Sequence, residues 1–269
     1  MSRSAVLSGL LAAALYASPA AAAMKAEPLE WSVGQDRFSG WLVYDDDDDD
    51  GDRRPGLVMV PNWMGVTEDA LERAKAIAGD DYVVLVADVY GKGRQPKDSG
   101  EAGKLAGSLR GDDRGPLRAR MQAAVDTLRA QASGAPLDAT RIGAFGFCFG
   151  GSAALELARA GADVAGVVSL HGGLAPGAQS PTAQRIAAPV LVLNGADDKA
   201  VSDADILAFE QEMDTAGADW QFVDFSGAAH CFAEPSAGSD PANNCRYDAR
   251  AARRAYRIMD GFFEEVFGD

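Results

Sequence analysis

Two patterns of apolar residues alternate along the chain. One is a short run of consecutive apolar residues, and the other is a segment in which apolar residues recur every three or four positions. Short continuous runs of apolar residues are typical of buried strands, and apolar residues three and four positions apart are typical of amphipathic helices. The runs predict strands at 39–44, 56–61, 82–87, 141–147, 164–170, 190–194 and 220–225, and the periodic segments predict helices at 67–79, 116–128, 149–160, 203–215 and 247–267. Such alternation over about 245 residues predicts one doubly wound, mainly parallel α/β domain.

Two polar stretches interrupt this alternation. Residues 45–50 are six consecutive aspartates between the first two predicted strands. They lack the spaced ligands of a calcium loop, so we expect them to form the solvated tip of a hairpin. Residues 89–115 contain seven glycines and form a long connection, with a helical turn expected near 105–109. Long loops in compact domains are usually functional, and this one is a candidate for a mobile lid.

The first 23 residues differ in composition from the rest of the chain. Arg3 precedes an apolar run at 5–17, and small residues with one proline follow at 18–23. This is the pattern of a secretory signal peptide, and its cleavage would leave a mature chain that begins near Ala23 or Met24. We therefore expect residues 24–269 to form the folded domain of a periplasmic or secreted protein, in a compartment that permits disulfides.

The net charge limits the classes of partner. The 269 residues include 25 Lys and Arg against 40 Asp and Glu, which gives a formal net charge of -15. An acidic surface repels phosphate backbones and anionic lipid headgroups, so we expect neither nucleic acid nor membrane as a partner. No internal stretch approaches the ~20 apolar residues of a membrane helix. We expect a monomer that acts on a small molecule.

The most informative motif is Gly-Phe-Cys-Phe-Gly-Gly at 146–151, between a predicted strand and a predicted helix. This is the context of a nucleophile elbow, with Cys148 at the place of the usual serine. The strained turn needs glycines two positions before and after the nucleophile, because these positions pack too closely for side chains. The helix N-terminus favours the thiolate, and the backbone N–H of Phe149 is available to a developing oxyanion.

Other interpretations of this cysteine have less support in the sequence. A glycine-rich turn between a strand and a helix also occurs at nucleotide-binding sites, but no P-loop lysine follows and the G-x-G-x-x-G spacing is absent. A redox-active thiol is expected to have a C-x-x-C partner, which the sequence lacks. Cys148 is therefore the candidate nucleophile.

A cysteine nucleophile needs a base, and the chain has two histidines. His230 follows the last predicted strand, where the α/β-hydrolase order of nucleophile, acid and histidine places the base. His171 ends an earlier strand and is expected to line or support the site. Asp197 and Asp198 follow the strand at 190–194, and spacing alone leaves them nearly equal as candidates for the acid.

Along the whole predicted mature domain the chain resembles the dienelactone hydrolase family. The resemblance is carried by Gly-Phe-Cys-Phe-Gly-Gly at 146–151, Gly-Ala-Asp-Asp-Lys-Ala-Val at 195–201, Gly-Ala-Ala-His-Cys-Phe at 227–232, Pro-Asn-Trp-Met-Gly at 61–65 and Ala-Asp-Val-Tyr-Gly at 87–91. It implies an α/β-hydrolase fold, and it makes Asp198 the acid because the family's acid is the fourth residue of the Gly-x-x-Asp segment. It also implies that the backbone N–H of Trp63 is a second oxyanion donor and that Asn62 and Tyr90 join His171 at the substrate pocket.

Two departures from the family bear on the substrate. The family's lactone enzymes carry a glutamate in contact with the cysteine, where this chain has Asn62, and a neutral amide cannot exchange a proton with the thiol. Those enzymes also bind the substrate carboxylate with arginines. One such position is Glu234 here, and the other falls near Lys92 or Arg94. A neutral ester or lactone is therefore expected at least as much as an anionic dienelactone.

The sequence thus predicts a hydrolase that cleaves a small carboxylic ester or lactone through Cys148, His230 and Asp198, with an acyl-enzyme intermediate and no metal or other cofactor. The alternative is a non-catalytic ligand-binding protein on a hydrolase scaffold. The missing glutamate favours this alternative, and the intact order of the triad argues against it.

The two remaining cysteines are expected to pair with each other. Three cysteines allow three pairings, and two of these would consume Cys148. An exported protein is in a compartment that permits disulfides, and an active thiol has to stay unpaired. One disulfide and one free cysteine satisfy both conditions. We therefore predict a Cys231–Cys245 disulfide that closes a loop of about 15 residues and holds His230 near Cys148.

Overall fold

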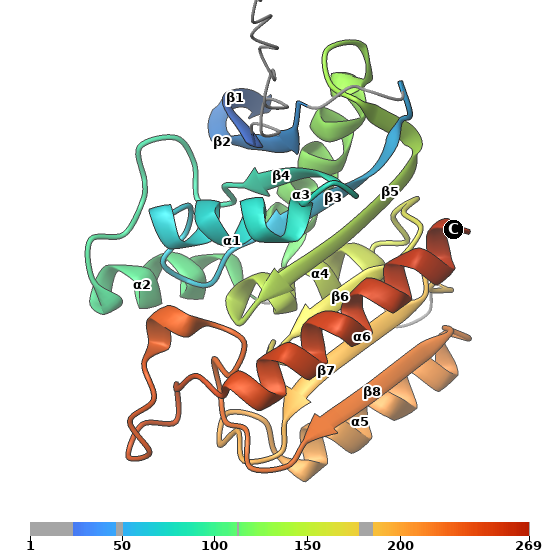
Figure 1. Cartoon of the computed structure of the whole chain (residues 1–269). Coiled ribbons are helices and arrows are strands. Elements are labelled where there is room, and N and C mark those ends of the chain that lie inside the picture. The colour runs from blue at the N-terminus through green and yellow to red at the C-terminus, as the bar shows by residue number, and fades with distance from the viewer. Residues whose placement is uncertain (1–23, 47–50, 112, 178–184, 269) are drawn as a thin grey trace, which may run out of the picture.

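The computed structural model describes residues 24–46, 51–111, 113–177 and 185–268, and in these ranges an eight-stranded sheet carries helices on both faces (Figure 1). The strand order is β1-β2-β4-β3-β5-β6-β7-β8. Strands β3 to β8 are parallel to one another, and β1 and β2 form an antiparallel hairpin at one edge. The predicted mainly parallel α/β domain is confirmed.

Apart from β1 and the full length of α2, the elements follow one another in the predicted order. The strands are β1 (Met24–Val33), β2 (Asp36–Asp45), β3 (Arg54–Val60), β4 (Val83–Ala87), β5 (Leu137–Phe147), β6 (Val167–Leu170), β7 (Val190–Gly195) and β8 (Trp220–Phe225). The helices are α1 (Glu68–Ala78), α2 (Ser99–Leu109), α3 (Gly115–Arg129), α4 (Phe149–Arg159), α5 (Asp203–Thr215) and α6 (Ala249–Phe267), with short 3₁₀ turns η1 (Ala130–Ser133) and η2 (Pro235–Ala237).

Polar side chains determine where several helices begin. The Thr67 hydroxyl accepts the Ala70 N–H at the start of α1, and Ser202 and Asp205 form a reciprocal capping box at the start of α5. The Asp248 carboxylate accepts two backbone N–H groups at the start of α6. Because these signals are local, the predicted starts of these helices agree with the structure to within two residues.

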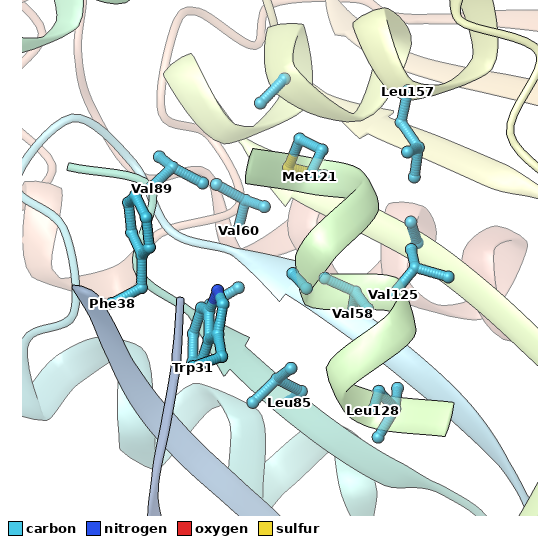
Figure 2. Close-up of a cluster of buried hydrophobic side chains, with 14 of the residues drawn as sticks. Trp31, Phe38, Val58, Val60, Leu85, Val89, Met121, Val125, Leu128 and Leu157 are labelled. Atoms are coloured by element: carbon cyan, nitrogen blue, oxygen red, sulfur yellow. The ribbon is translucent and has the colours of Figure 1, made fainter. Parts of the chain in front are cut away.

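Helices α3, α4 and α5 cover one face of the sheet, and α1 and α6 cover the other (Figure 1). Figure 2 shows the first of these layers, where the apolar stripe of α3 packs on β3 and β4. The labelled side chains there include Met121, Val125 and Leu128 from the helix and Val58, Val60 and Leu85 from the strands. Alternate residues of the strands point to the α1 and α6 face, so the sheet is buried on both sides.

The prediction of a hairpin between the strands at 39–44 and 56–61 is wrong. Strand β2 pairs antiparallel with β4, as in Gly40 opposite Ala87, and β4 separates β2 from β3. The real hairpin joins β2 to β1, which was not predicted. Strand β1 is a half-buried edge strand without a continuous apolar run. Of the aspartates, 47–50 lie outside the described residues.

The turn expected near 105–109 is the end of an eleven-residue helix, α2, capped by Asp98. Glycines at 100, 103 and 107 lower its helix propensity, which explains why its full length was not predicted. The predicted signal peptide at 1–23 lies outside the described residues. Among the helices that are described, none is both long and apolar enough to cross a membrane.

Candidate active site

Cys148 lies in the sharp turn between β5 and α4, with a backbone φ of 53°. The close packing of the turn requires the two glycines that flank it. A Cβ atom at Gly146 would lie 2.2 Å from the backbone of Gly150, and a Cβ atom at Gly150 would lie 2.0 Å from the carbonyl oxygen of Val60. The chain therefore forms the predicted elbow at the carboxyl ends of β3 and β5.

The structure brings the three candidate triad side chains together. His230 Nε2 lies 3.0 Å from Cys148 Sγ, and His230 Nδ1 lies 2.7 Å from Asp198 Oδ2. Asp198 follows β7 and is buried, whereas the neighbouring Asp197 is exposed. Of the two carboxylates that spacing left open, only Asp198 contacts the imidazole among the described contacts.

Hydrogen bonds shift the pKa values of His230 and Asp198. Burial lowers the pKa of His230, but hydrogen bonds to Asp198 and Cys148 outweigh it and raise the pKa to about 10. Burial alone would raise the pKa of Asp198. Hydrogen bonds from His230, the Ala200 N–H and the Asn244 amide hold that pKa below its usual value instead. The arrangement therefore favours a carboxylate beside an imidazole that readily takes a proton.

Trp63 forms one wall of the cleft beside the thiol, and Tyr90 lies behind it. The Tyr90 hydroxyl donates to the Trp63 carbonyl oxygen at 2.9 Å, and the Tyr90 ring stacks on Phe149 with ring centres 5.5 Å apart. The two residues expected to supply oxyanion N–H groups are thus connected through Tyr90. Tyr90 is buried and lies behind the cleft, where it supports the wall.

A buried polar network lies behind the elbow. The Asn62 amide donates to Glu234, and Arg73 pairs with the same carboxylate at 3.2 Å while stacking over the Phe147 ring. Burial raises the pKa of Glu234, although Arg73 and Asn62 act against this. Asn62 Oδ1 accepts the Met64 N–H. Both ends of the Asn62 amide are therefore bonded away from the thiol.

His171 belongs to the support of the elbow. Its side chain is fully buried, and its Nδ1 accepts the Cys148 backbone N–H at 3.1 Å. Its Nε2 lies 3.8 Å from Glu234 Oε1, which is too long for a hydrogen bond. Burial, followed by the nearby His230 and Arg73, lowers the pKa of His171 well below its usual value. We conclude that His171 is a neutral acceptor beneath Cys148.

Two cavities, of about 530 Å³ and 380 Å³, meet at Cys148 and Trp63. Asn62 lines the smaller one, and neither Tyr90 nor His171 lines either. A larger cavity of about 610 Å³ lies between α1 and α6, away from the thiol. Among the described residues, no group of three or more His, Cys, Asp or Glu side chains is arranged to hold a metal ion.

Cationic side chains line the larger cavity at Cys148, although not those that the family pattern suggested. Lys92 pairs with Glu30 at the surface, and neither Lys92 nor Arg94 lines a cavity at the thiol. Arg110, which follows α2, and Arg114 line it instead. No local pattern in the sequence indicated these two residues, because they reach the site only through the path of α2.

The predicted disulfide is present between Cys231 and Cys245. Both cysteines line the cavities at Cys148, which is the free cysteine of the described chain. The loop that the disulfide closes returns beside His230, since the Arg246 N–H donates to the His230 carbonyl oxygen at 2.9 Å. The segment containing His230 is thereby held by a covalent bond and by a backbone hydrogen bond.

Acid is expected to destabilise the fold through His171. Because its pKa in the folded protein is lowered, the unfolded chain binds the proton more readily. The stability that neutral His171 contributes is present above about pH 6.5 and is lost below it, by up to about 1.4 kcal/mol per pH unit. In urea denaturation, the free energy of unfolding should therefore fall more steeply between about pH 7.5 and about pH 5.5 for the wild type than for His171→Asn.

The Asn side chain keeps an acceptor for the Cys148 N–H and removes the titrating group. Glu234, whose pKa is raised by burial, acts with the opposite sign but is present in both proteins. Equal slopes in wild type and His171→Asn would contradict the assignment of His171 as a buried neutral base.

Comparison with known proteins agrees with the fold and with the motifs. A family model described as the dienelactone hydrolase family matches residues 41–267. The solved structure named m3DLH is 38% identical with a TM-score of 0.82, over 91% of this chain and 99% of its own. A dienelactone hydrolase-like promiscuous phosphotriesterase, P91, from metagenomic libraries is 35% identical with a TM-score of 0.81, over 91% of this chain and 99% of its own.

A relative from Caenorhabditis elegans, the uncharacterized protein K02A2.1, is 32% identical over 157 residues, which are 58% of this chain and 98% of its own length. The family match covers most of the chain and includes the elbow, the Asp198 segment and the His230 segment. The chain therefore belongs to the dienelactone hydrolase family, and with it to the carboxylic ester and lactone hydrolases of α/β-hydrolase fold.

Proposed function

We propose that the protein hydrolyses a small carboxylic ester or lactone with Cys148 as nucleophile, His230 as base and Asp198 as the acid that orients the base. One observation carries the proposal. A single imidazole contacts the thiol at 3.0 Å through Nε2 and the buried carboxylate at 2.7 Å through Nδ1. This is the geometry by which a nucleophile is activated and its base is held in one tautomer.

The proposed reaction has two halves. His230 takes the proton of Cys148, and the thiolate attacks the ester carbonyl carbon. The carbonyl oxygen becomes an oxyanion that the N–H groups of Phe149 and Trp63 stabilise. Collapse of this intermediate expels the alcohol, which takes the proton from His230, and leaves a thioester on Cys148. Water that gives a proton to His230 then hydrolyses the thioester, releases the acid and restores the thiol.

The shape of the cleft supports a substrate with two parts. Cys148 and Trp63 line both cavities, so an ester bond above the thiol has one cavity for the acyl part and one for the alcohol. Volumes of 530 Å³ and 380 Å³ limit both parts to small groups. The larger cavity is lined by apolar side chains such as Leu174 and Val201, with Arg110 among them. The mechanism uses one chain and no cofactor.

Removing the sulfur is expected to abolish turnover. Cys148→Ala leaves no nucleophile, so kcat for p-nitrophenyl acetate should fall by about a thousandfold or more, to the level that the remaining donors provide. The measurement is release of p-nitrophenol at saturating substrate. The thermal unfolding temperature of the variant should match that of the wild type, which would confirm that the fold is intact.

Equal activity of the wild type and Cys148→Ala would disprove the mechanism. The alternative of a binding protein without turnover makes a different prediction. In that case the wild type would hydrolyse no ester in a broad panel, and the variant would bind ligands as the wild type does.

Arg110 is expected to favour anionic substrates. Its guanidinium lies 5.4 Å from the centre of the Phe149 ring, and no ion pair of Arg110 is found among the described residues. Arg110→Gln should raise KM about fivefold for an ester that carries a carboxylate and leave KM for its neutral analogue unchanged, since an exposed cation contributes only about 1 kcal/mol. Steady-state kinetics with both esters measures this.

Lys104→Gln is the matched control, because this exposed lysine lies on α2 and lines neither cavity at Cys148. If both variants raise KM equally, the effect comes from net charge alone. An unchanged KM for the anionic ester in Arg110→Gln would exclude Arg110 from substrate binding.

We also propose that residues 1–23 are a cleaved signal peptide and that the mature protein is periplasmic or secreted. The disulfide beside the site supports this proposal, because disulfides persist in oxidising compartments. Intact-mass measurement of protein recovered from the periplasm or medium should give a chain that begins near Ala23 or Met24. Recovery of the uncleaved chain from the cytoplasm alone would count against export.

A further inference from the structure

The loop closed by the Cys231–Cys245 disulfide contacts the acid as well as the base. Asn244, next to Cys245, donates from Nδ2 to Asp198 Oδ1 at 3.1 Å. Its Oδ1 accepts the backbone N–H of Lys199 at 3.1 Å. Both ends of the amide are therefore bonded to the segment that contains the acid, which fixes the orientation of the amide.

Asp198 has a separate partner set for each of its oxygens. Oδ2 contacts His230 Nδ1, and Oδ1 accepts from the Ala200 N–H at 2.8 Å and from Asn244. The Ala200 donor is local and belongs to the turn after β7. Asn244 is the side-chain donor to Oδ1 in the described contacts, and it comes from a segment 46 residues further along the chain.

The loop reaches this position through bonds at its end. The disulfide joins Cys245 to the residue after His230, and His230 and Cys245 pair as an isolated β-bridge. The Arg246 N–H then donates to the His230 carbonyl oxygen. Asn244 is thereby held between the base and the acid, in a segment without regular secondary structure.

We propose that Asn244 is a positioning residue for the triad, held against Asp198 by the Cys231–Cys245 disulfide. The proposal rests on the proposed function, since it assigns Asn244 to the support of the same acid. With the amide in place, Oδ1 is saturated with donors and Oδ2 remains directed at the imidazole. Without the amide, the Ala200 N–H is left as the donor described for Oδ1, so the carboxylate is held less firmly and the imidazolium formed in each half-reaction loses part of its fixed counter-charge.

The pKa of Asp198 is consistent with this role, because Asn244 is one of the donors that lower it. Within the described part of the chain, the titratable groups found to interact with Asp198 are His230, which contacts it, and His171, whose pKa it affects. Both remain unchanged in the variants below, so differences in pH dependence report on residue 244.

Asn244→Ala removes the donor, and the expected result is a kcat about tenfold lower with KM within about twofold of the wild type. The pH at which kcat/KM reaches half of its maximum should rise, because the Cys148–His230 pair loses support for its charged form. Asn243→Ala is the matched control. That exposed neighbour bonds to Asp240 and not to Asp198, so its kinetics should equal those of the wild type.

Asn244→Asp separates positioning from folding. A carboxylic acid at this place can donate to Asp198 when protonated and repels it when ionised. Activity relative to Asn244→Ala should therefore be higher at low pH and lower at high pH. A purely structural effect would lower activity by the same factor at every pH.

A double-mutant cycle tests the part played by the disulfide. Cys231→Ala with Cys245→Ala should lower kcat, and adding Asn244→Ala to this pair should lower it little further. Wild-type kcat and pH profile in Asn244→Ala would overturn the positioning role. Additive losses in the cycle would overturn the claim that the disulfide acts through Asn244.

Alkylation of Cys148 by iodoacetamide keeps the test independent of ester turnover. If no ester is hydrolysed by the wild type, the proposed function fails, but the pH midpoint of alkylation still reports on the Cys148–His230 pair. The midpoint should be higher in Asn244→Ala than in the wild type and in Asn243→Ala. An equal midpoint in all three proteins would overturn the proposal on its own.

Discussion

The strained turn at Cys148 is the constraint on which the rest of the site depends. A positive φ at a residue with a side chain costs about 1 kcal/mol or more, and the surrounding packing has to compensate for it. The approach of Gly150 to the Val60 carbonyl oxygen fixes α4 against β3, and the Cys148 N–H donates to both the Leu170 carbonyl oxygen and His171. Cys148 is therefore held by two neighbouring strands and by the helix that follows it.

Much of the fold could be predicted because its signals are local. Caps at Thr67, Ser202 and Asp248 and continuous apolar runs are contained in a few adjacent residues. The pairing of β2 with β4 is not, because it depends on strands separated by about 40 residues. Strand β1 has a different signal, a period of two with Trp31 and Val33 between polar residues, which a search for continuous runs does not detect.

The residues of the candidate site also divide into those that a local sequence motif indicates and those that no local motif indicates. The elbow and the segments with Asp198 and His230 have motifs, so their residues could be named from the sequence. Arg73, Arg110 and Asn244 have none, since each reaches the site through contacts with residues far away in the chain. In the sequence, Glu234 stands out only as a departure from the family pattern. Its burial against Arg73 shows that this position has a partner of its own in this protein.

These partners determine how the thiol could be activated. The Asn62 amide bonds to Glu234 and to the Met64 N–H, so it neither accepts a proton nor points at the sulfur. Under the proposed mechanism His230 is then the acceptor for the thiol proton, and its raised pKa suits that task. The raised pKa of His230 depends on its hydrogen bond to Asp198. Under this mechanism, activation of the Cys148 thiol therefore depends on how Asp198 is held. If the proposals hold, the disulfide-held loop that keeps this carboxylate in place supports an activation of Cys148 that needs no glutamate at position 62.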